Sequence, residues 1–403
     1  MKCAFIYDHT FFIINSKVYS SGAFTKDSWK RYLNHFDELI VVGNVVHLPS
    51  HKYDRYNRVE SEAVQFEYLP SARNIKGYLQ YTTGRVKKLQ KLLNNVDAVV
   101  IRLPSEIGLF ASRLADELGK PKLFELVGDV WGTYWSHGSI KGKLLAPLSY
   151  WKTRKTIESS KYTIYVTKQY LQSRYPTNGE SIAASNVVIN VYNKSEITKT
   201  RIETFNNNIK KSRIALIGSS DVKFKGHDIL LKAIAKLDNP DNYEIHFVGP
   251  GKTGWLIELA TSLGLNTKNL VFHGKIKAGT QVFSILDRAD LYIHPSSWEG
   301  LPRTVIEAMS RGLPVLASNV GGIPELIDNE FLHPPRDYSK LASDIQQFYT
   351  KSYKERIKIS YANRDKAKGY AIDILEKRRI AFFEKFTSDI KKKYYPFEHR
   401  HNI

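Results

Sequence analysis

Two glutamates eight positions apart, Glu299 and Glu307, have the chemistry needed to bind a ligand with several hydroxyl groups. Carboxylates accept hydrogen bonds from hydroxyls, so the pair is suited to hold a sugar and a ribose on either side of a diphosphate. The residues after Glu299 are expected to form a tight loop and, from Pro302 on, the first turn of a helix: Gly300, Leu301, Pro302 and Arg303. Amides at a helix N-terminus have no partner within the helix and bind phosphate. The alternative is a strand, a loop and a helix that carries two surface glutamates, and the spacing alone leaves both open.

A glycine-flanked loop with two lysines, Lys223 and Lys225, precedes this stretch in the same half of the chain. The loop runs from Gly218 to Gly226 after the expected strand 213–217, and Lys225 stands directly before a helix. Such a loop is a candidate cradle for an anion. Because both loops follow strands, both are expected at the carboxyl edge of one parallel sheet, where open α/β folds bind ligands.

Short apolar runs alternate with helical stretches along the whole chain, which predicts an α/β fold with two mostly parallel sheets covered by helices. In the first half the expected strands are 2–7, 39–46, 64–69, 98–103, 123–127 and 162–166, and the expected helices include 26–36, 84–93 and 107–118. In the second half the expected strands are 213–217, 244–248, 270–273, 291–294 and 315–317, and the expected helices are 227–237, 253–263, 282–287, 338–349, 352–368 and 372–392. We therefore expect one domain over 1–193, another over 212–371, and a polar link over 194–211.

Two loops of the first half carry further candidate residues. Gly22, in the small-residue loop 20–23, would let backbone amides approach a phosphate or an acceptor, although a plain helix cap is the alternative. Asp129 follows the expected strand 123–127, with His137 just beyond it, so both are candidate catalytic side chains at the sheet edge. The alternative for Asp129 is that it caps a turn.

The composition indicates a soluble globular protein that is large enough for two cores, with 403 residues, 42% hydrophobic and 25% charged. The one cysteine, Cys3, excludes an internal disulfide and cysteine-rich zinc sites and fits a reducing compartment. The apolar run 3–7 is too short for a signal-peptide core, and no run approaches the roughly 18 residues that span a bilayer. We expect a cytoplasmic protein.

The net charge of +20 points to nucleic acid, an anionic membrane or phosphorylated ligands as partners. Residues 1–200 hold 28 Lys and Arg against 17 Asp and Glu, residues 201–365 hold 22 against 18, and residues 366–403 hold 10 against 5. The excess therefore lies in the first half and the tail. Two lysine-rich stretches, 84–95 and 141–155, are candidates for contact with an anionic membrane, although 84–95 reads first as a helix facing its own core. No nucleic-acid-binding motif is recognised, so no nucleic acid partner is expected.

The stretch EGLPRTVIEAMSRGLPVLAS, which begins at Glu299, resembles the E-x7-E signature of the retaining, nucleotide-sugar-dependent glycosyltransferases of the GT-B fold. Further motifs in the same order also resemble segments of that family: 217–228, 247–251, 271–274 and 321–325. The resemblance is dense over roughly residues 213–330 and loose over the first half. It departs at Ser219 and Ser220, where the family commonly has an arginine for the diphosphate. Lys223 is the candidate substitute, but it lacks the bidentate geometry of arginine.

The resemblance implies a structure and a set of roles. Two Rossmann-like domains would face each other across a cleft, the first would bind the acceptor, and the C-terminal helix, about 372–403, would complete that first domain. Glu307 would bind the ribose, Glu299 would contact the donor sugar, and the diphosphate would be held by Lys225 and the amides of 300–303. The loop that starts at Gly218 would support this corner, and Gly274 and Ile276 would flank the base.

The resemblance and the residues together predict the reaction. The enzyme would move a sugar from a nucleoside-diphosphate sugar, with UDP as the expected nucleotide, to a glycan or lipid-linked acceptor in surface polysaccharide or glycolipid synthesis. No Asp-x-Asp is present, and a lysine with oriented amides can stabilise the departing phosphate, so no metal or other cofactor is expected. No carboxylate is clearly placed as a nucleophile, which favours front-face attack with retention. The alternatives are a nucleotide-sugar epimerase or a phosphorylase of the same fold, and a basic nucleic-acid-binding protein.

Overall fold

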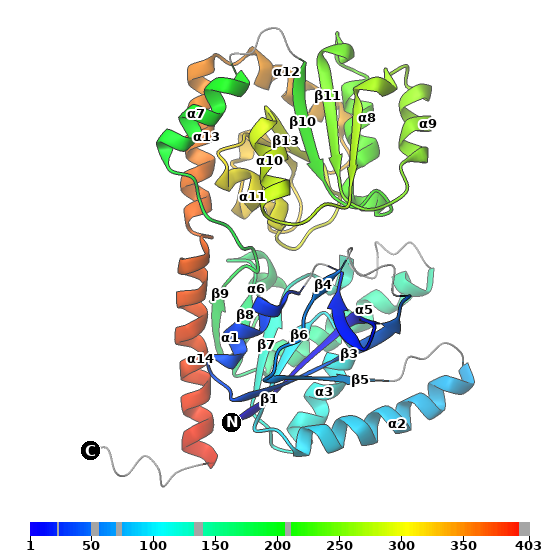
Figure 1. The fold of residues 1–403 in the computed structure, drawn as a ribbon, viewed down its shortest axis with the longest axis vertical. Coiled ribbons are helices and arrows are strands. Elements are labelled where there is room, and N and C mark those ends of the chain that lie inside the picture. Colours follow the sequence, from blue (N-terminus) through cyan, green and yellow to red (C-terminus); the bar gives the residue numbers. More distant parts are fainter. Residues whose placement is uncertain (22–23, 50–55, 70–74, 133–139, 206–210, 395–403) are drawn as a thin grey trace. The chain divides into compact units, whose positions relative to one another are not determined.

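The structure is a computed structural model that describes residues 1–21, 24–49, 56–69, 75–132, 140–205 and 211–394. Its contacts divide the chain into two units (Figure 1). The first contains Met1–Val166, Leu171–Ala184 and Glu376–Ile403, and the second contains Thr167–Tyr170 and Ser185–Leu375. The division differs from the expected boundary at 193, because the segment after Ala184 belongs to the second unit.

The first unit is built on a sheet whose pairings are parallel except for two at one side. Its strands are β1 (Lys2–Ile14), β2 (Lys17–Ser20), β3 (Glu38–His47), β4 (Asn57–Arg58), β5 (Val64–Tyr68), β6 (Ala98–Leu103), β7 (Lys122–Leu126), β8 (Tyr162–Tyr165) and β9 (Glu180–Ala183). β1 lies between β3 and β6 and is parallel to both, while β2 pairs antiparallel with β1 and with β4. Residues 3–6 are fully buried, as expected for a central strand covered on both faces.

β1 is longer than the expected strand 2–7, because the polar residues Asp8 and His9 do not end it. Asp8 has a structural partner: its Oδ2 accepts hydrogen bonds from the backbone N–H groups of Glu106 and Ile107, at 2.5 and 3.3 Å. These groups belong to the first turn of α3 (Glu106–Glu117), where a carboxylate is favourable. β1 therefore continues to Ile14 and turns back into β2, a hairpin that the sequence reasoning did not predict.

The remaining helices of the first unit include α1 (Lys30–Leu33), α2 (Ile75–Asn94), α5 (Ile140–Glu158) and most of α14 (Ile372–Tyr394). Leu89, Leu92 and Leu93 of α2 are buried, which confirms that the stretch 84–95 faces its own core. α14 packs on this unit: the Phe383 ring contacts that of Tyr32 at 5.8 Å between centroids. Over the residues that the structure describes, no helix is both long enough and apolar enough to cross a membrane.

The second unit has a sheet of strands that all pair in parallel, in the order β12-β11-β10-β13-β14-β15. Its strands are β10 (Ser212–Ile217), β11 (Tyr243–Val248), β12 (Leu270–Gly274), β13 (Leu291–His294), β14 (Val315–Ser318) and β15 (Leu332–His333). Its helices include α8 (His227–Ile234), α9 (Gly254–Ser262), α10 (Thr280–Arg288), α11 (Arg303–Ser310), α12 (Tyr338–Thr350) and α13 (Tyr353–Lys368). Apolar side chains of β10, β11, α8 and α12 form one buried core.

The link expected over 194–211 is largely a helix, α7 (Lys194–Phe205), which is part of the second unit. Its buried face consists of Ile197, Arg201 and Phe205, one residue per turn, so most of its sequence is polar and resembles a connection. Arg201 is fully buried, and its guanidinium donates to the carbonyls of Ala289 and Leu286 at 2.6 and 3.2 Å. Because the middle residue of this buried face is an arginine, the sequence of α7 lacks the continuous apolar stripe by which an amphipathic helix is recognised.

Candidate functional site

The loops after β10 and β13 lie side by side because their strands are neighbours. The chain builds the sheet outward from β10 through β11 to β12, then returns to the other side of β10 with β13. Ligands bind at this kind of reversal, outside the carboxyl ends of the strands. The two loops touch: Ser297 N and Ser296 Oγ both donate to the carbonyl of Phe224, at 2.8 and 2.9 Å. The structure therefore brings the lysine loop and the glutamate loop together.

Glu299 and Lys225 form an ion pair at the centre of this junction. Lys225 Nζ lies 2.6 Å from Glu299 Oε1, and the imidazole Nε2 of His294 lies 2.8 Å from the same oxygen. Burial works to raise the pKa of Glu299, but the charge of Lys225 and the hydrogen bonds from His294 and Lys225 outweigh it and hold the pKa at about 2. Glu299 is therefore an ionised carboxylate in a nearly enclosed position.

His294 joins this pair to the helix that carries Glu307, and the sequence reasoning did not single it out. The His294 Nδ1 atom lies 3.1 Å from the hydroxyl of Tyr292, and that hydroxyl lies 2.9 Å from Oγ1 of Thr304 in the first turn of α11. Tyr292 and His294 are fully buried and alternate along β13, so they point to the same face. That alternation of two polar aromatic residues at a strand end was the available signal.

Glu307 lies on α11 and is partly buried. Burial raises the pKa of its carboxyl, and the charge of Arg303 opposes this rise. Within the described part of the chain, no group donates a hydrogen bond to the carboxylate. Glu307 thus presents unused acceptor oxygens, as a ribose-binding carboxylate requires.

The N-terminus of α11 faces the same junction. The helix begins at Arg303, and Pro302 is its N-cap, one residue before the first turn in which it was expected. Pro302 offers no side chain to the first amides, and no side chain caps the helix there. In the loop before the helix, the carbonyl of Gly300 accepts a hydrogen bond from Gly322 N at 2.7 Å. Leu301, the next residue, is buried.

The lysine loop is held close to the neighbouring strand ends by glycines. A Cβ at Gly226, which has a φ of 76°, would lie 2.1 Å from the carbonyl oxygen of Pro295. Gly218 leaves room for the stem of Lys225, since a Cβ there would meet its methylene carbons at 3.2 to 3.4 Å. Lys223 does not reach the junction in this structure: its Nζ lies over the ring of Trp255 at 4.1 Å from the centroid.

Ser220, one of the two serines at the family's arginine position, is buried and bonded through its backbone. Ser220 donates from its backbone N–H to the carbonyl of Pro250 at 3.0 Å, which packs this turn against the loop after β11. Gly274 and Ile276, the residues expected beside a base, lie at the end of β12 and just after it, on the outer side of the same carboxyl edge. Gly274 has a φ of 62°, and its carbonyl accepts from Gly249 N at 2.9 Å.

The segment 321–325 packs against the backbone of the loop that carries Glu299. Gly321 and Gly322 contact the backbone of Glu299 and Gly300 so closely that neither has room for a side chain. Glu325 accepts hydrogen bonds from three successive backbone amides, those of Lys168, Gln169 and Tyr170, at 2.6 to 3.0 Å. Its carboxylate therefore serves the fold.

In the first unit, Asp129 lies within a hydrogen-bond network. It is 2% exposed, accepts from the hydroxyl of Tyr175 at 2.5 Å and from Trp131 N at 3.2 Å, and pairs with Arg174 Nε at 3.1 Å. This environment favours the turn-stabilising alternative for Asp129. His137 and Gly22 lie outside the described residues.

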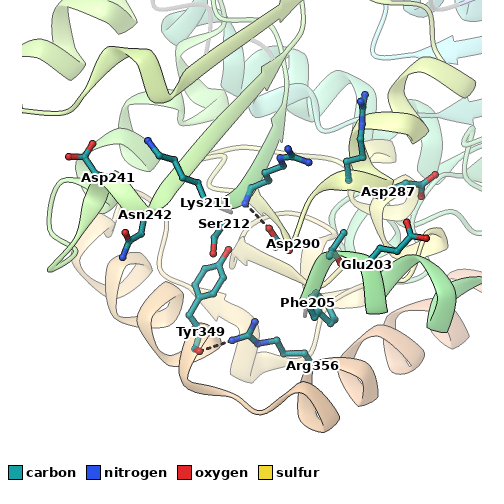
Figure 2. Close-up of a pocket in the computed structure, with 13 residues that line it drawn as sticks. Glu203, Phe205, Lys211, Ser212, Asp241, Asn242, Asp287, Asp290, Tyr349 and Arg356 are labelled. Atoms are coloured by element: carbon teal, nitrogen blue, oxygen red, sulfur yellow. Dashed lines mark hydrogen bonds between the residues drawn. The ribbon is translucent and has the colours of Figure 1, made fainter. Parts of the chain in front are cut away.

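A pocket of the second unit, drawn in Figure 2, lies where the strands of its sheet begin. It has a volume of about 770 Å³ and is lined by residues at the starts of strands, such as Ser212, Asn242 and Asp290. Acidic and basic side chains alternate around it, and Arg356 is turned to the carbonyl of Tyr349 at 2.6 Å. Since parallel sheets bind ligands at the carboxyl edge, this pocket is not the candidate site.

Comparisons with known proteins identify the family of the chain. A family model described as glycosyl transferases group 1 matches residues 199–366. Protein CapJ of Staphylococcus aureus is 32% identical over 385 residues, covering 94% of each chain. The putative teichuronic acid biosynthesis glycosyltransferase TuaC of Bacillus subtilis is 31% identical over 138 residues, covering 34% of this chain and 33% of TuaC.

Among solved structures, HepE of Anabaena in complex with UDP superimposes with a TM-score of 0.65. The match covers 96% of this chain and 100% of the HepE chain at 17% identity, and it confirms the predicted α/β fold with two Rossmann-like parallel-sheet domains, the GT-B fold. With the full-length similarity to CapJ and the family match over the second unit, the chain belongs to the group 1 glycosyltransferases.

Proposed function

We propose that this enzyme transfers a sugar from a UDP-linked donor to a glycan or lipid-linked acceptor in surface polysaccharide or glycolipid synthesis. The observation that carries the proposal is the Lys225–Glu299 ion pair beside the N-terminus of α11, with the carboxylate of Glu307 unused on the same helix. The teichuronic acid role in the name of TuaC supports the choice of pathway class, and the UDP bound to HepE supports the choice of nucleotide.

The roles of the residues follow from their chemistry. The ammonium of Lys225 and the amides of α11 would stabilise the charge that develops on the diphosphate as the glycosidic bond breaks. Glu299 would accept a hydroxyl of the donor sugar, and Glu307 would accept the ribose hydroxyls. The reaction would need no metal ion, because these fixed positive groups supply the stabilisation. We further propose front-face attack with retention of the anomeric configuration.

A thermal-shift screen against UDP, GDP and their common sugar conjugates tests the donor assignment. Ligands that bind only the folded state raise its melting temperature. We expect UDP and a UDP-sugar to stabilise the wild type with and without EDTA, and Lys225→Ala to weaken UDP binding by about 10- to 100-fold. Stabilisation by no nucleotide, or by metal-loaded samples only, would contradict the proposal. The anomeric configuration of the product, read from its proton NMR coupling, tests retention.

We also propose that the first unit contacts an anionic membrane through α5. The helix buries Ala146, Thr153 and Ile157. The opposite face exposes four large apolar side chains: Leu144, Leu145, Leu148 and Trp151. Lys152 and Lys155 are exposed beside them, a combination that favours the interface of an anionic bilayer. This contact would place the enzyme at the inner face of the membrane, where a lipid-linked acceptor is presented.

Flotation with vesicles measures this contact. Wild-type protein should float with phosphatidylglycerol vesicles at low salt and much less with phosphatidylcholine vesicles. The double variant Leu148→Ser, Trp151→Ser should lose most of this binding. Ile257→Ser, which removes an exposed apolar side chain from α9 of the second unit, is the matched control. Equal flotation of the double variant and the control would refute the assignment of α5.

A further inference from the structure

One oxygen of Glu299 accepts two hydrogen bonds while the other has none within the described part of the chain. Lys225 Nζ and His294 Nε2 both donate to Oε1, at 2.6 and 2.8 Å. This arrangement fixes the carboxylate through one oxygen. The second oxygen, Oε2, stays available to accept a hydroxyl group from a ligand.

The two donors differ in their freedom to move. The side chain of Lys225 is 23% exposed, whereas that of His294 is 2% exposed. Lysine carries its charge on a flexible four-carbon stem, so it can turn from the carboxylate to a phosphate group that enters beside it. The other nitrogen of the His294 ring, Nδ1, is bonded to the hydroxyl of Tyr292. The two rings are stacked, with an angle of 23° between their planes.

We propose that His294 is the positioning residue that keeps Glu299 in place when Lys225 turns to the diphosphate of the donor. The proposal rests on the proposed function, since it assigns the donor diphosphate to Lys225. Without His294, binding of the diphosphate would remove the remaining hydrogen-bond donor from Oε1. Glu299 would then be a buried carboxylate with no fixed orientation, and its contact with the donor sugar would be lost. The same chain of hydrogen bonds continues through Tyr292 to Thr304, and it fixes the position of Glu299 relative to α11.

The variants His294→Phe and His294→Gln separate this role from simple packing. Phenylalanine keeps a buried ring and removes both hydrogen bonds, whereas glutamine keeps an N–H donor near the position of Nε2. His333→Leu is the matched control, because His333 is also 1% exposed and neither of its ring nitrogens has a hydrogen-bond partner in the described structure.

The first measurement compares UDP affinity with turnover of UDP-glucose. We expect His294→Phe to change the Kd of UDP by less than about threefold. It should lower the rate of UDP-glucose hydrolysis, in which water takes the glucosyl group and UDP leaves, by about 10- to 100-fold, the effect of one charged hydrogen bond. His294→Gln should recover part of that rate, and His333→Leu should match the wild type. A rate for His294→Phe equal to that of the control would overturn the proposal, as would equal losses in UDP affinity and rate.

A second measurement needs no donor, so it separates this proposal from the proposed function. Crystal structures of the unliganded Lys225→Ala variant should show Glu299 still bonded to His294. Adding His294→Phe should displace the carboxylate or leave it in several orientations. An unchanged Glu299 in the double variant would overturn the proposal even if UDP binds. A wild type that binds neither UDP nor UDP-glucose would instead refute the donor assignment and leave this crystallographic result as the deciding test.

Discussion

Gly321 and Glu299 pack backbone against backbone: a Cβ at Gly321 would lie 2.1 Å from the carbonyl oxygen of Glu299. Gly321 also has a φ of 58°, in the left-handed region that favours glycine. The loop that carries Glu299 is therefore held by a contact that only glycine permits. The motif at 321–325 therefore holds the Glu299 loop in place, a role that requires no contact between its residues and a ligand.

Gly321→Ala should both destabilise the second unit and displace the Glu299 loop. Gly264→Ala is the matched control, because Gly264 has a φ of 74° and no atom within 4 Å of the added methyl group. The left-handed backbone alone costs about 1 kcal/mol, so we expect about that loss for Gly264→Ala and clearly more for Gly321→Ala. Urea unfolding measures the loss, and UDP-glucose turnover should fall for Gly321→Ala alone. Equal losses of stability in the two variants would show that the Glu299 loop can move away from the added methyl group without a loss of free energy.

Glu307→Ala should weaken the binding of nucleotides through their ribose. Wild-type protein should bind UDP more tightly than 2′,3′-dideoxy-UDP by about tenfold or more, since each hydrogen bond to a charged acceptor contributes about 1.5 to 3 kcal/mol. Glu307→Ala should bind the two nucleotides equally. Calorimetric titration provides both affinities. If the variant still prefers UDP by the same factor, another group binds the ribose.

The strands of the second unit could be predicted closely, because each is a short apolar run bounded by turn residues. The expected strand 291–294 and helix 227–237 lie within a residue or a few of β13 and α8. The positions of Lys225 and Glu299 followed from the rule that loops after parallel strands share one edge. Local sequence thus contained the information for these elements.

Other features depend on contacts between distant residues and left little local signal. His294 becomes part of the site only because Glu299 folds back onto the end of β13. Lys223 has the same side chain as Lys225 two positions later, yet it lies on Trp255 of α9. The buried face of α7 relies on Arg201, whose partners are carbonyls more than eighty positions away. Side-chain type at a single position does not specify such partners.

The ionisation of Glu299 should contribute stability that is lost in acid. Its pKa of about 2 in the folded protein lies below the ordinary value of 4.5, so the folded state holds its proton more weakly than the unfolded state. The contribution is therefore complete above pH 4.5 and falls as the pH drops through about 2. Its full size is on the order of 3 kcal/mol. The difference in unfolding free energy between wild type and Glu299→Gln should stay constant from pH 7 to about pH 4.5 and shrink by pH 3, with Glu258→Gln as the control for loss of one charge.

Asp129→Asn should reduce the stability of the first unit, because the structure uses this carboxylate as an acceptor for its own neighbours. Burial and the nearby Asp129 charge raise the pKa of Tyr175, which keeps its hydroxyl protonated as a donor. Asparagine would retain the shape of Asp129 but leave Arg174 without its counter-charge, which we expect to cost about 2 to 3 kcal/mol. Tyr175→Phe removes two hydrogen bonds, the one that the hydroxyl donates to Asp129 and the one that it accepts from Val130 N, and should cost about 1 to 2 kcal/mol. Urea unfolding distinguishes these losses. If Asp129→Asn unfolds like the wild type but loses UDP-glucose turnover, the carboxylate acts in catalysis, because loss of the charge from a structural ion pair with Arg174 would lower the stability.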